Sequence, residues 1–193
     1  MDAGRLKIGA AQLSGMALPF YTVGHSTRTI DEFVRLLRTA GVTLVVDIRT
    51  VPRSRTNPQY NKDALPGSLA AFHIRYRDIP ELGGLRGKSK VVPPEVNSFW
   101  ENQSFHNYAD YALTEAFRAG LLQLIALGRE EPCAMMCSEA VWWRCHRRIV
   151  SDYLIGRGES VFHLMGDDRI EAAKLTEGAH VRDNGDVTYP ARY

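Results

Sequence analysis

The alternation of strand-like and helix-like segments from residue 21 onward constrains the fold most. Residues 21–26 and 43–49 each have the pattern of a strand, and the second is a continuous apolar run that ends in charged residues. Between them, residues 29–32 offer a helix N-cap with an acid three positions on, and a stripe of apolar residues at helical spacing runs to Ala40. A strand, helix, strand order with a buried second strand is typical of a parallel unit. We therefore expect an α/β fold, a three-layer sandwich with a mostly parallel central sheet of the Rossmann-like type.

The rest of the chain continues this alternation. The predicted elements are a short helix over 64–71, an extended segment over 73–79, a helix over 108–127, a strand over 132–137, a helix over 147–155 and a strand over 160–165. Residues 85–97 show no periodicity and carry three basic side chains, so they are a candidate lid or binding loop. Residues 1–20 are expected to form a loosely ordered N-terminal arm. Residues 21–193 fit a single α/β domain, because 193 residues with 45% hydrophobic content can bury one core.

Charge and cysteine content narrow the class of protein. A formal net charge of +2 gives the whole surface no strong preference for nucleic acid or for an acidic membrane. No run reaches the ~18 apolar residues of a membrane span, so no membrane partner is expected. The three cysteines, all between residues 133 and 145, do not make the disulfide framework of a secreted protein. A reducing cytoplasm is the expected location.

The segment from Cys133 to Arg148 is the best candidate for a chemical centre. It holds all three cysteines together with a glutamate, a histidine and three arginines. A buried strand precedes these polar residues and a helix follows them. In open α/β sheets, ligands bind at the carboxyl ends of the strands, and the N–H groups of a helix start favour anions.

Polar residues also follow two other predicted strands. The carboxyl ends of parallel strands share one edge of a sheet, so we expect these residues to form one ligand site. The catalytic candidates are His25, Cys137, Glu139 and His146. The ligand-binding candidates are Asp47, Arg49, Arg53, Tyr60 and Arg147. The excess of arginine favours a phosphate or carboxylate ligand.

Each candidate also has a structural interpretation. Cys137 is either a nucleophile with a lowered pKa or a small buried core residue, and the bulky residues 141–143 argue against a phosphatase-like loop. Glu139, His146 and Arg147 form an acid, base and anion clamp, or else Glu139 and Arg147 only make a salt bridge that caps the helix. His25 could simply be a hydrogen-bonded residue at a turn. Four aromatic residues could stack on a base, pack against a helix, or lie in the interface of a homodimer: Tyr60, Trp100, Trp142 and Trp143.

A metal site is not expected from the sequence. Cys137 and Cys133 are four positions apart on a presumed strand, and no C-x-x-C pair exists. Cys145 and His146 are adjacent in a presumed helix, where neighbouring side chains point apart. The sequence does not identify a cofactor, and neither a G-x-G-x-x-G fingerprint nor a phosphate-binding P-loop is present.

Several of these motifs together resemble the family named domain of unknown function 488. The matching pieces, in order, are residues 22–26, 46–49 with 52–54, 82–84, 108–111, 137–139 and 145–147, so the resemblance spans most of residues 21–190. It implies an α/β fold and no particular activity. One departure is visible: members of the family often have a histidine shortly before a late Leu-Thr pair, where this chain has Glu171 to Thr176.

Two functional hypotheses follow from the sequence. The first is an enzyme that acts on a phosphate-bearing ligand, a nucleotide or nucleic acid, with arginines holding the phosphate. The second is a non-catalytic nucleic-acid-binding module that uses the same basic edge of the sheet. Both use phosphate contacts, so the salt dependence of binding would not separate them, whereas turnover would.

Overall fold

The fold is built on a six-stranded sheet in the order β3-β2-β4-β1-β5-β6. The computed structural model describes residues 17–166 and 169–191. The strands are β1 (Phe20–Gly24), β2 (Leu44–Asp47), β3 (Arg75–Asp78), β4 (Cys133–Cys137), β5 (Val161–Leu164) and β6 (Ile170–Ala172), with a separate pair β7 (His180–Val181) and β8 (Val187–Thr188). The first five strands run parallel, and β6 is an antiparallel edge strand on β5. The predicted mostly parallel sheet is confirmed.

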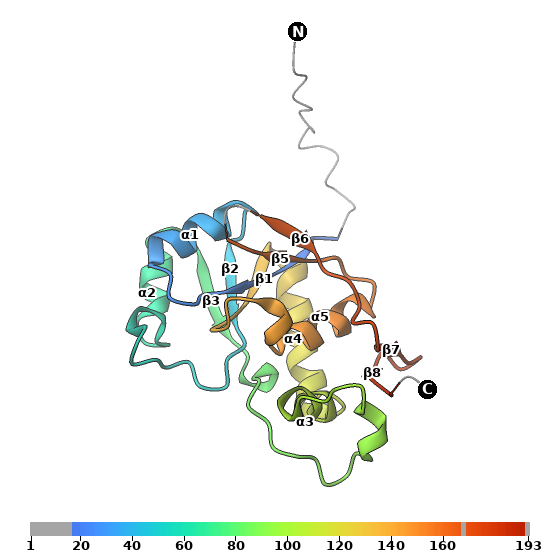
Figure 1. Cartoon of the computed structure of the whole chain (residues 1–193). Coiled ribbons are helices and arrows are strands. Elements are labelled where there is room, and N and C mark those ends of the chain that lie inside the picture. The colour runs from blue at the N-terminus through green and yellow to red at the C-terminus, as the bar shows by residue number, and fades with distance from the viewer. Residues whose placement is uncertain (1–16, 167–168, 192–193) are drawn as a thin grey trace.

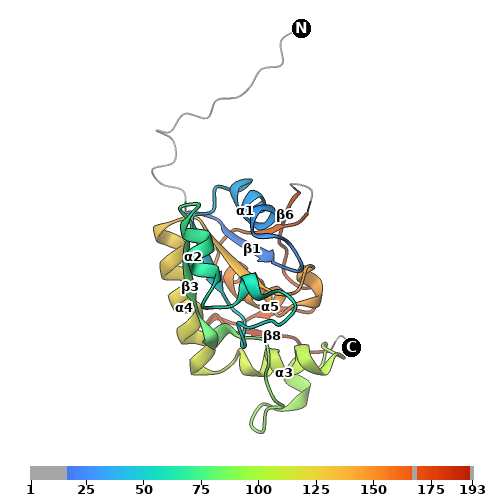
Figure 2. The same cartoon turned by 90° about the vertical axis from the view of Figure 1, so that its left-hand side faces the viewer.

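Helices cover both faces of this sheet. They are α1 (Ile30–Arg38), α2 (Leu65–Ala70), α3 (Gln103–Tyr111), α4 (Glu115–Glu130) and α5 (Arg147–Ile155), with short 3-10 turns η2 (Pro58–Tyr60), η3 (Pro80–Leu82), η4 (Pro94–Asn97) and η5 (Trp142–Arg144). In Figure 1, α1 and α2 lie on one side of the strands and α4 and α5 on the other. Turning the molecule brings α1 and α2 to the front, with α3 beyond the end of the sheet (Figure 2). The predicted three-layer α/β sandwich is confirmed.

Each of the two helical layers packs on the sheet through its own apolar cluster. Val45 of β2 and Met136 of β4 belong to the cluster under α1 and α2, whereas Val46 and Met135 belong to the cluster under α4 and α5. This alternation follows from the strand geometry, in which successive side chains point to opposite faces. All residues of β2 and β4 are buried, as expected for central strands covered on both faces.

Local signals in the sequence set several helix ends. Thr29 forms the expected capping box with Glu32 at the start of α1. The predicted helix over 108–127 is wrong as a single element, because α3 ends at Tyr111 and Thr114 caps a new helix, α4. The Thr114 side chain accepts a hydrogen bond from the Phe117 N–H, which makes it an N-cap.

The structure does not test the expectations about the N-terminal arm, the cellular location and the oligomeric state. Residues 1–16, most of the expected N-terminal arm, lie outside the described part of the chain. Within residues 17–166 and 169–191, no helix is long and apolar enough to cross a membrane. A cytoplasmic location and a homodimer stay predictions.

Candidate functional site: the strand-end cavity

A cavity of about 730 Å³ opens at the carboxyl ends of the parallel strands. We call it the strand-end cavity. Six of the nine candidate site residues line it: His25, Arg49, Arg53, Cys137, Glu139 and His146. Asp47, Tyr60 and Arg147 do not, and they lie buried behind its wall.

The strand order explains this convergence. β4 lies between β1 and β2, so His25, Arg49 and Cys137 end three neighbouring strands. The loop after β4 folds closely over the end of β1, where His25 and Ser26 donate backbone hydrogen bonds to the carbonyl oxygens of Cys137 and Ser138. A Cβ atom on Gly24 would lie 1.8 Å from the Glu139 carbonyl oxygen, so this close approach requires glycine.

Arg49 is fixed by a buried hydrogen-bond network. Its Nε donates to Asp47 Oδ1 at 2.8 Å, and its two terminal nitrogens donate to Asp47, to the Tyr60 carbonyl oxygen and to His25. The Tyr76 hydroxyl donates to Asp47 Oδ2 at 2.8 Å. Burial acts to lower the pKa of Arg49, but the hydrogen bonds and negative charge of Asp47 outweigh it and raise that pKa. Arg49 is therefore a neutralised, rigid part of the cavity wall.

His25 is held in one tautomer by its neighbours. Its Nδ1–H donates to the Ser26 carbonyl oxygen at 2.8 Å, and its Nε2 accepts from Arg49 at 3.2 Å. The imidazole also stacks on Tyr60 at a centroid distance of 4.0 Å. Burial lowers the pKa of His25 to about 4, with a further lowering from the charges of Arg49 and Arg147. Both ring nitrogens serve protein partners, so His25 is better placed to orient Arg49 than to transfer protons. Tyr60 supports His25 from behind and does not reach the cavity.

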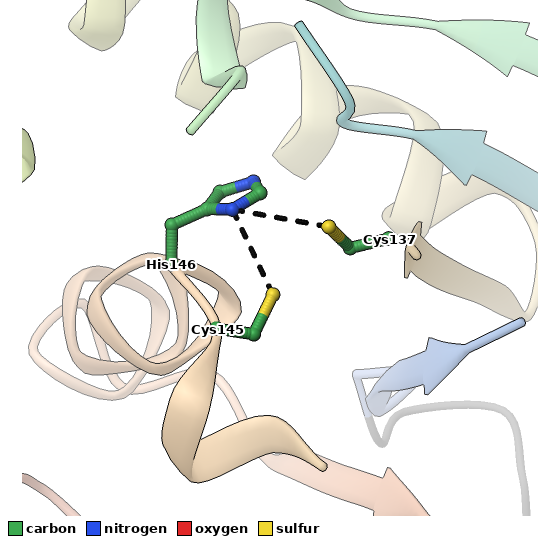
Figure 3. A group of neighbouring side chains, drawn as sticks. All are labelled: Cys137, Cys145 and His146. Atoms are coloured by element: carbon green, nitrogen blue, oxygen red, sulfur yellow. Dashed lines mark hydrogen bonds between the residues drawn. The ribbon is translucent and has the colours of Figure 1, made fainter. Parts of the chain in front are cut away.

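The floor of the cavity brings two thiols and an imidazole together. Cys137 ends β4, while Cys145 and His146 stand immediately before α5, and their side chains point toward one another (Figure 3). His146 Nδ1 lies 3.9 Å from Cys137 Sγ and 3.7 Å from Cys145 Sγ. On the other side of the ring, Nε2–H donates to the Ile48 carbonyl oxygen at 2.9 Å. The Nδ1 lone pair therefore faces the two sulfur atoms.

This arrangement corrects one sequence expectation. Cys145 and His146 were expected to diverge as helical neighbours, but Cys145 has an extended backbone (φ −126°, ψ 146°), and only His146, the N-cap of α5, has helical backbone angles. The change of backbone conformation turns both side chains toward Cys137. The divergence was one of the grounds for expecting no metal site, and that ground is lost, whereas the absence of a C-x-x-C pair still holds.

Arg147 is buried beneath this floor. Its side chain donates from Nε to Cys145 Sγ at 3.2 Å and from a terminal nitrogen to the Glu139 carbonyl oxygen. The salt bridge with the Glu139 carboxylate, which was the structural alternative for this pair, is not formed. Burial acts to raise the pKa of Cys145, but the hydrogen bond from Cys137 and the charge of Arg147 lower it to about 6. The hydrogen bond to Cys145 and burial together raise the pKa of Cys137 to about 12. Cys145, not the expected Cys137, is thus the thiol with thiolate character.

The rim of the cavity carries exposed charged side chains. Arg53 and Arg144 line it, are exposed, and form no hydrogen bond, ion pair or ring contact with any residue in the described ranges. Glu139 is also exposed at the rim. The expected binding loop contributes less, because Arg86 is tied to Gly83 and Pro80 carbonyl oxygens and lies over the Tyr111 ring.

Sequence reasoning missed four residues at this site. Cys145 and Arg144 were in the right segment, and their position just before the helix start was the available signal. Phe105 and Tyr108 of α3 form an apolar wall beside His146, with the Tyr108 ring centroid 5.0 Å from that of His146. No local pattern could have placed α3 against the strand ends.

A protein-family model, described as Domain of unknown function DUF488, matches residues 29–154. The chain belongs to this family. The match includes β2, β4, the start of α5 and all of the cavity-floor residues Cys137, Cys145 and His146, but not His25. The expected resemblance over residues 21–190 is confirmed for this narrower range. Comparisons with curated proteins and with solved structures gave no significant match.

Proposed function

We propose that this DUF488 protein is an enzyme that acts on a phosphate-bearing ligand, a nucleotide or nucleic acid, bound in the strand-end cavity. The observation that carries the proposal is the pair of unpartnered arginines, Arg53 and Arg144, at the rim of a cavity whose floor holds thiol and imidazole groups.

The two rim arginines suit an anionic ligand. A guanidinium presents a fork of N–H donors that matches the oxygen atoms of phosphate, and each charge-assisted hydrogen bond is stronger than a neutral one. Arg49 contributes less charge because Asp47 neutralises it, with a distance of 2.5 Å from Arg49 Nη2 to Asp47 Oδ2. Glu139 is the acidic residue among those that line the cavity, so the balance of charge at the rim is positive.

The shape of the site favours an enzyme over a nucleic-acid-binding module. A volume of about 730 Å³ lies within the roughly 300–1,000 Å³ of small-ligand sites. Stacking aromatics, which single-stranded nucleic-acid grooves use, are mostly committed elsewhere. Tyr60 and Trp100 are buried, and Trp142 stacks on His163 at 4.3 Å, which leaves Trp143 exposed. The cavity therefore suits a single nucleotide or one extruded base better than an extended strand.

A binding and turnover experiment tests the proposal. Wild-type protein is titrated calorimetrically with a panel of 5′-mononucleotides and a short single-stranded oligonucleotide, and the products are analysed by chromatography. Arg53→Gln and Arg144→Gln should each weaken binding by about tenfold or more, the loss expected when one charge-assisted hydrogen bond is removed.

Arg55→Gln is the matched control. Arg55 is exposed on the same loop as Arg53 and does not line the cavity. Equal weakening by Arg55→Gln and Arg53→Gln would mean that binding is nonspecific electrostatic attraction. Tight binding with no conversion of any ligand would favour the non-catalytic module.

A further inference from the structure

The cavity floor has the geometry of a metal site. Cys137 Sγ, Cys145 Sγ and His146 Nδ1 all lie within 4.8 Å of one another. In a tetrahedral zinc site, bonds of about 2.3 Å to sulfur and 2.0–2.1 Å to nitrogen place the nitrogen about 3.6 Å from each sulfur. The observed separations of 3.7 and 3.9 Å differ from this by only a few tenths of an ångström. Small rotations of the three side chains would close the site.

The surrounding contacts orient two of the three ligand atoms, His146 Nδ1 and Cys145 Sγ. The Nε2–H of His146 donates to the Ile48 carbonyl oxygen, which fixes the tautomer whose Nδ1 can bind a metal. Gly84 packs against the same ring, and a Cβ there would lie 2.4 Å from Nδ1. The Nε–H of Arg147 points at Cys145 Sγ, as an N–H donor does at a metal-bound thiolate. These contacts fix the His146 ring and the position of Cys145 Sγ.

We propose that Cys137, Cys145 and His146 bind one zinc(II) ion at the floor of the strand-end cavity. Two thiolates and one imidazole form a soft donor set, which selects zinc over magnesium, calcium or manganese. The three ligands come from the end of β4 and from the two residues directly before α5, so the metal also links the sheet to the helix.

The fourth coordination position of this zinc faces the cavity. All three ligands line the cavity, and three protein ligands with one open position are the arrangement of catalytic zinc sites. A water molecule at that position becomes a nucleophile near neutral pH. Zinc binding stands on the side-chain geometry alone, whereas the use of this water against a phosphate-bearing ligand rests on the proposed function.

Metal analysis of the wild-type chain is the first test, and it needs no substitution. Protein purified without chelator should contain close to one zinc per chain. Zinc-free protein titrated with cobalt(II) should show an intense thiolate-to-cobalt charge-transfer band and the strong visible bands of a tetrahedral site. Absence of stoichiometric zinc and of the charge-transfer band would overturn the proposal, as would a Cys137–Cys145 disulfide in protein purified without reductant.

Three alanine variants locate the site. Cys137→Ala and Cys145→Ala should each lower cobalt affinity by more than about 100-fold, because each removes a ligand. Cys133→Ala is the matched control, since Cys133 is a buried thiol on the same strand and is not part of the cluster. An equal loss in Cys133→Ala would contradict the assignment.

The result is separable from the proposed function. Arg53→Gln and Arg144→Gln leave the three metal ligands intact, so they should keep full zinc occupancy even where they lose nucleotide binding. Full zinc occupancy without any nucleotide binding would retain the metal site and refute the proposed ligand. Nucleotide binding by a protein that takes up no zinc would do the reverse.

Discussion

Replacing Asp47 by asparagine should destabilise the protein strongly. The Asp47 side chain is fully buried and Arg49 is 5% exposed, so the substitution leaves a buried guanidinium without its counter-charge. Asp47 also accepts hydrogen bonds from the Arg49 backbone and from the Tyr76 hydroxyl. Breaking a buried pair of this kind costs about 3–5 kcal/mol. For a domain of this size the loss corresponds to a fall in melting temperature of roughly 6–20 °C.

Asp78→Asn is the matched control for this measurement. Asp78 lies directly beside Asp47 in the β2–β3 register, but its partner Lys62 has a side chain that is 53% exposed. An exposed pair contributes about 0–1 kcal/mol. Urea unfolding followed by tryptophan fluorescence gives both free energies of unfolding. The reasoning is refuted if Asp47→Asn costs less than about 1 kcal/mol, or no more than Asp78→Asn.

Two further predictions concern the interior histidine of β5 and the glycine beside His146. Burial, with the charge of Arg147, lowers the pKa of His163 to about 4. Between pH 6.5 and 4 the unfolded chain therefore takes up a proton that the folded chain does not, so wild-type stability falls through this window as the pH falls. Urea unfolding of wild type and of His163→Gln measures this effect, because the contributions of opposing groups such as Asp152 cancel in the comparison. Relative to His163→Gln, the free energy of unfolding of wild type should fall by about 3 kcal/mol between pH 7 and pH 4. A difference between the two proteins that stays constant with pH would contradict this. Gly84→Ala should displace the His146 ring and lower the cobalt affinity by about tenfold or more. Gly87→Ala is the control and should leave the cobalt affinity unchanged, because a Cβ at that position meets nothing within 4 Å. Equal affinities of the two variants would show that the ring is free to move.

The order of strands and helices could be predicted from local pattern, but the strand order could not. Residues 21–26, 43–49 and 132–137 each showed their strand character in sequence. The position of β4 between β1 and β2 depends on contacts between residues about ninety or more positions apart, which no local window contains. The same limit applies to α3, which supplies a wall of the cavity.

The candidate site was predictable in location and less so in detail. Parallel strands place polar residues at one edge, and His25, Arg49 and Glu139 meet there as expected. Whether a side chain enters the cavity depends on backbone angles that the sequence does not reveal. Arg147, the first residue of α5, is buried, and Cys145 faces the cavity because its backbone is extended.

The location of a bound nucleotide tests the central claim most directly. The measurement is a crystal structure of the protein with the 5′-mononucleotide that binds most tightly in the calorimetric panel. We expect its phosphate within hydrogen-bond distance of Arg53 and Arg144, with the rest of the molecule extending toward Cys145 and His146. A phosphate bound outside the strand-end cavity, for example on the exposed Lys88, would contradict the account.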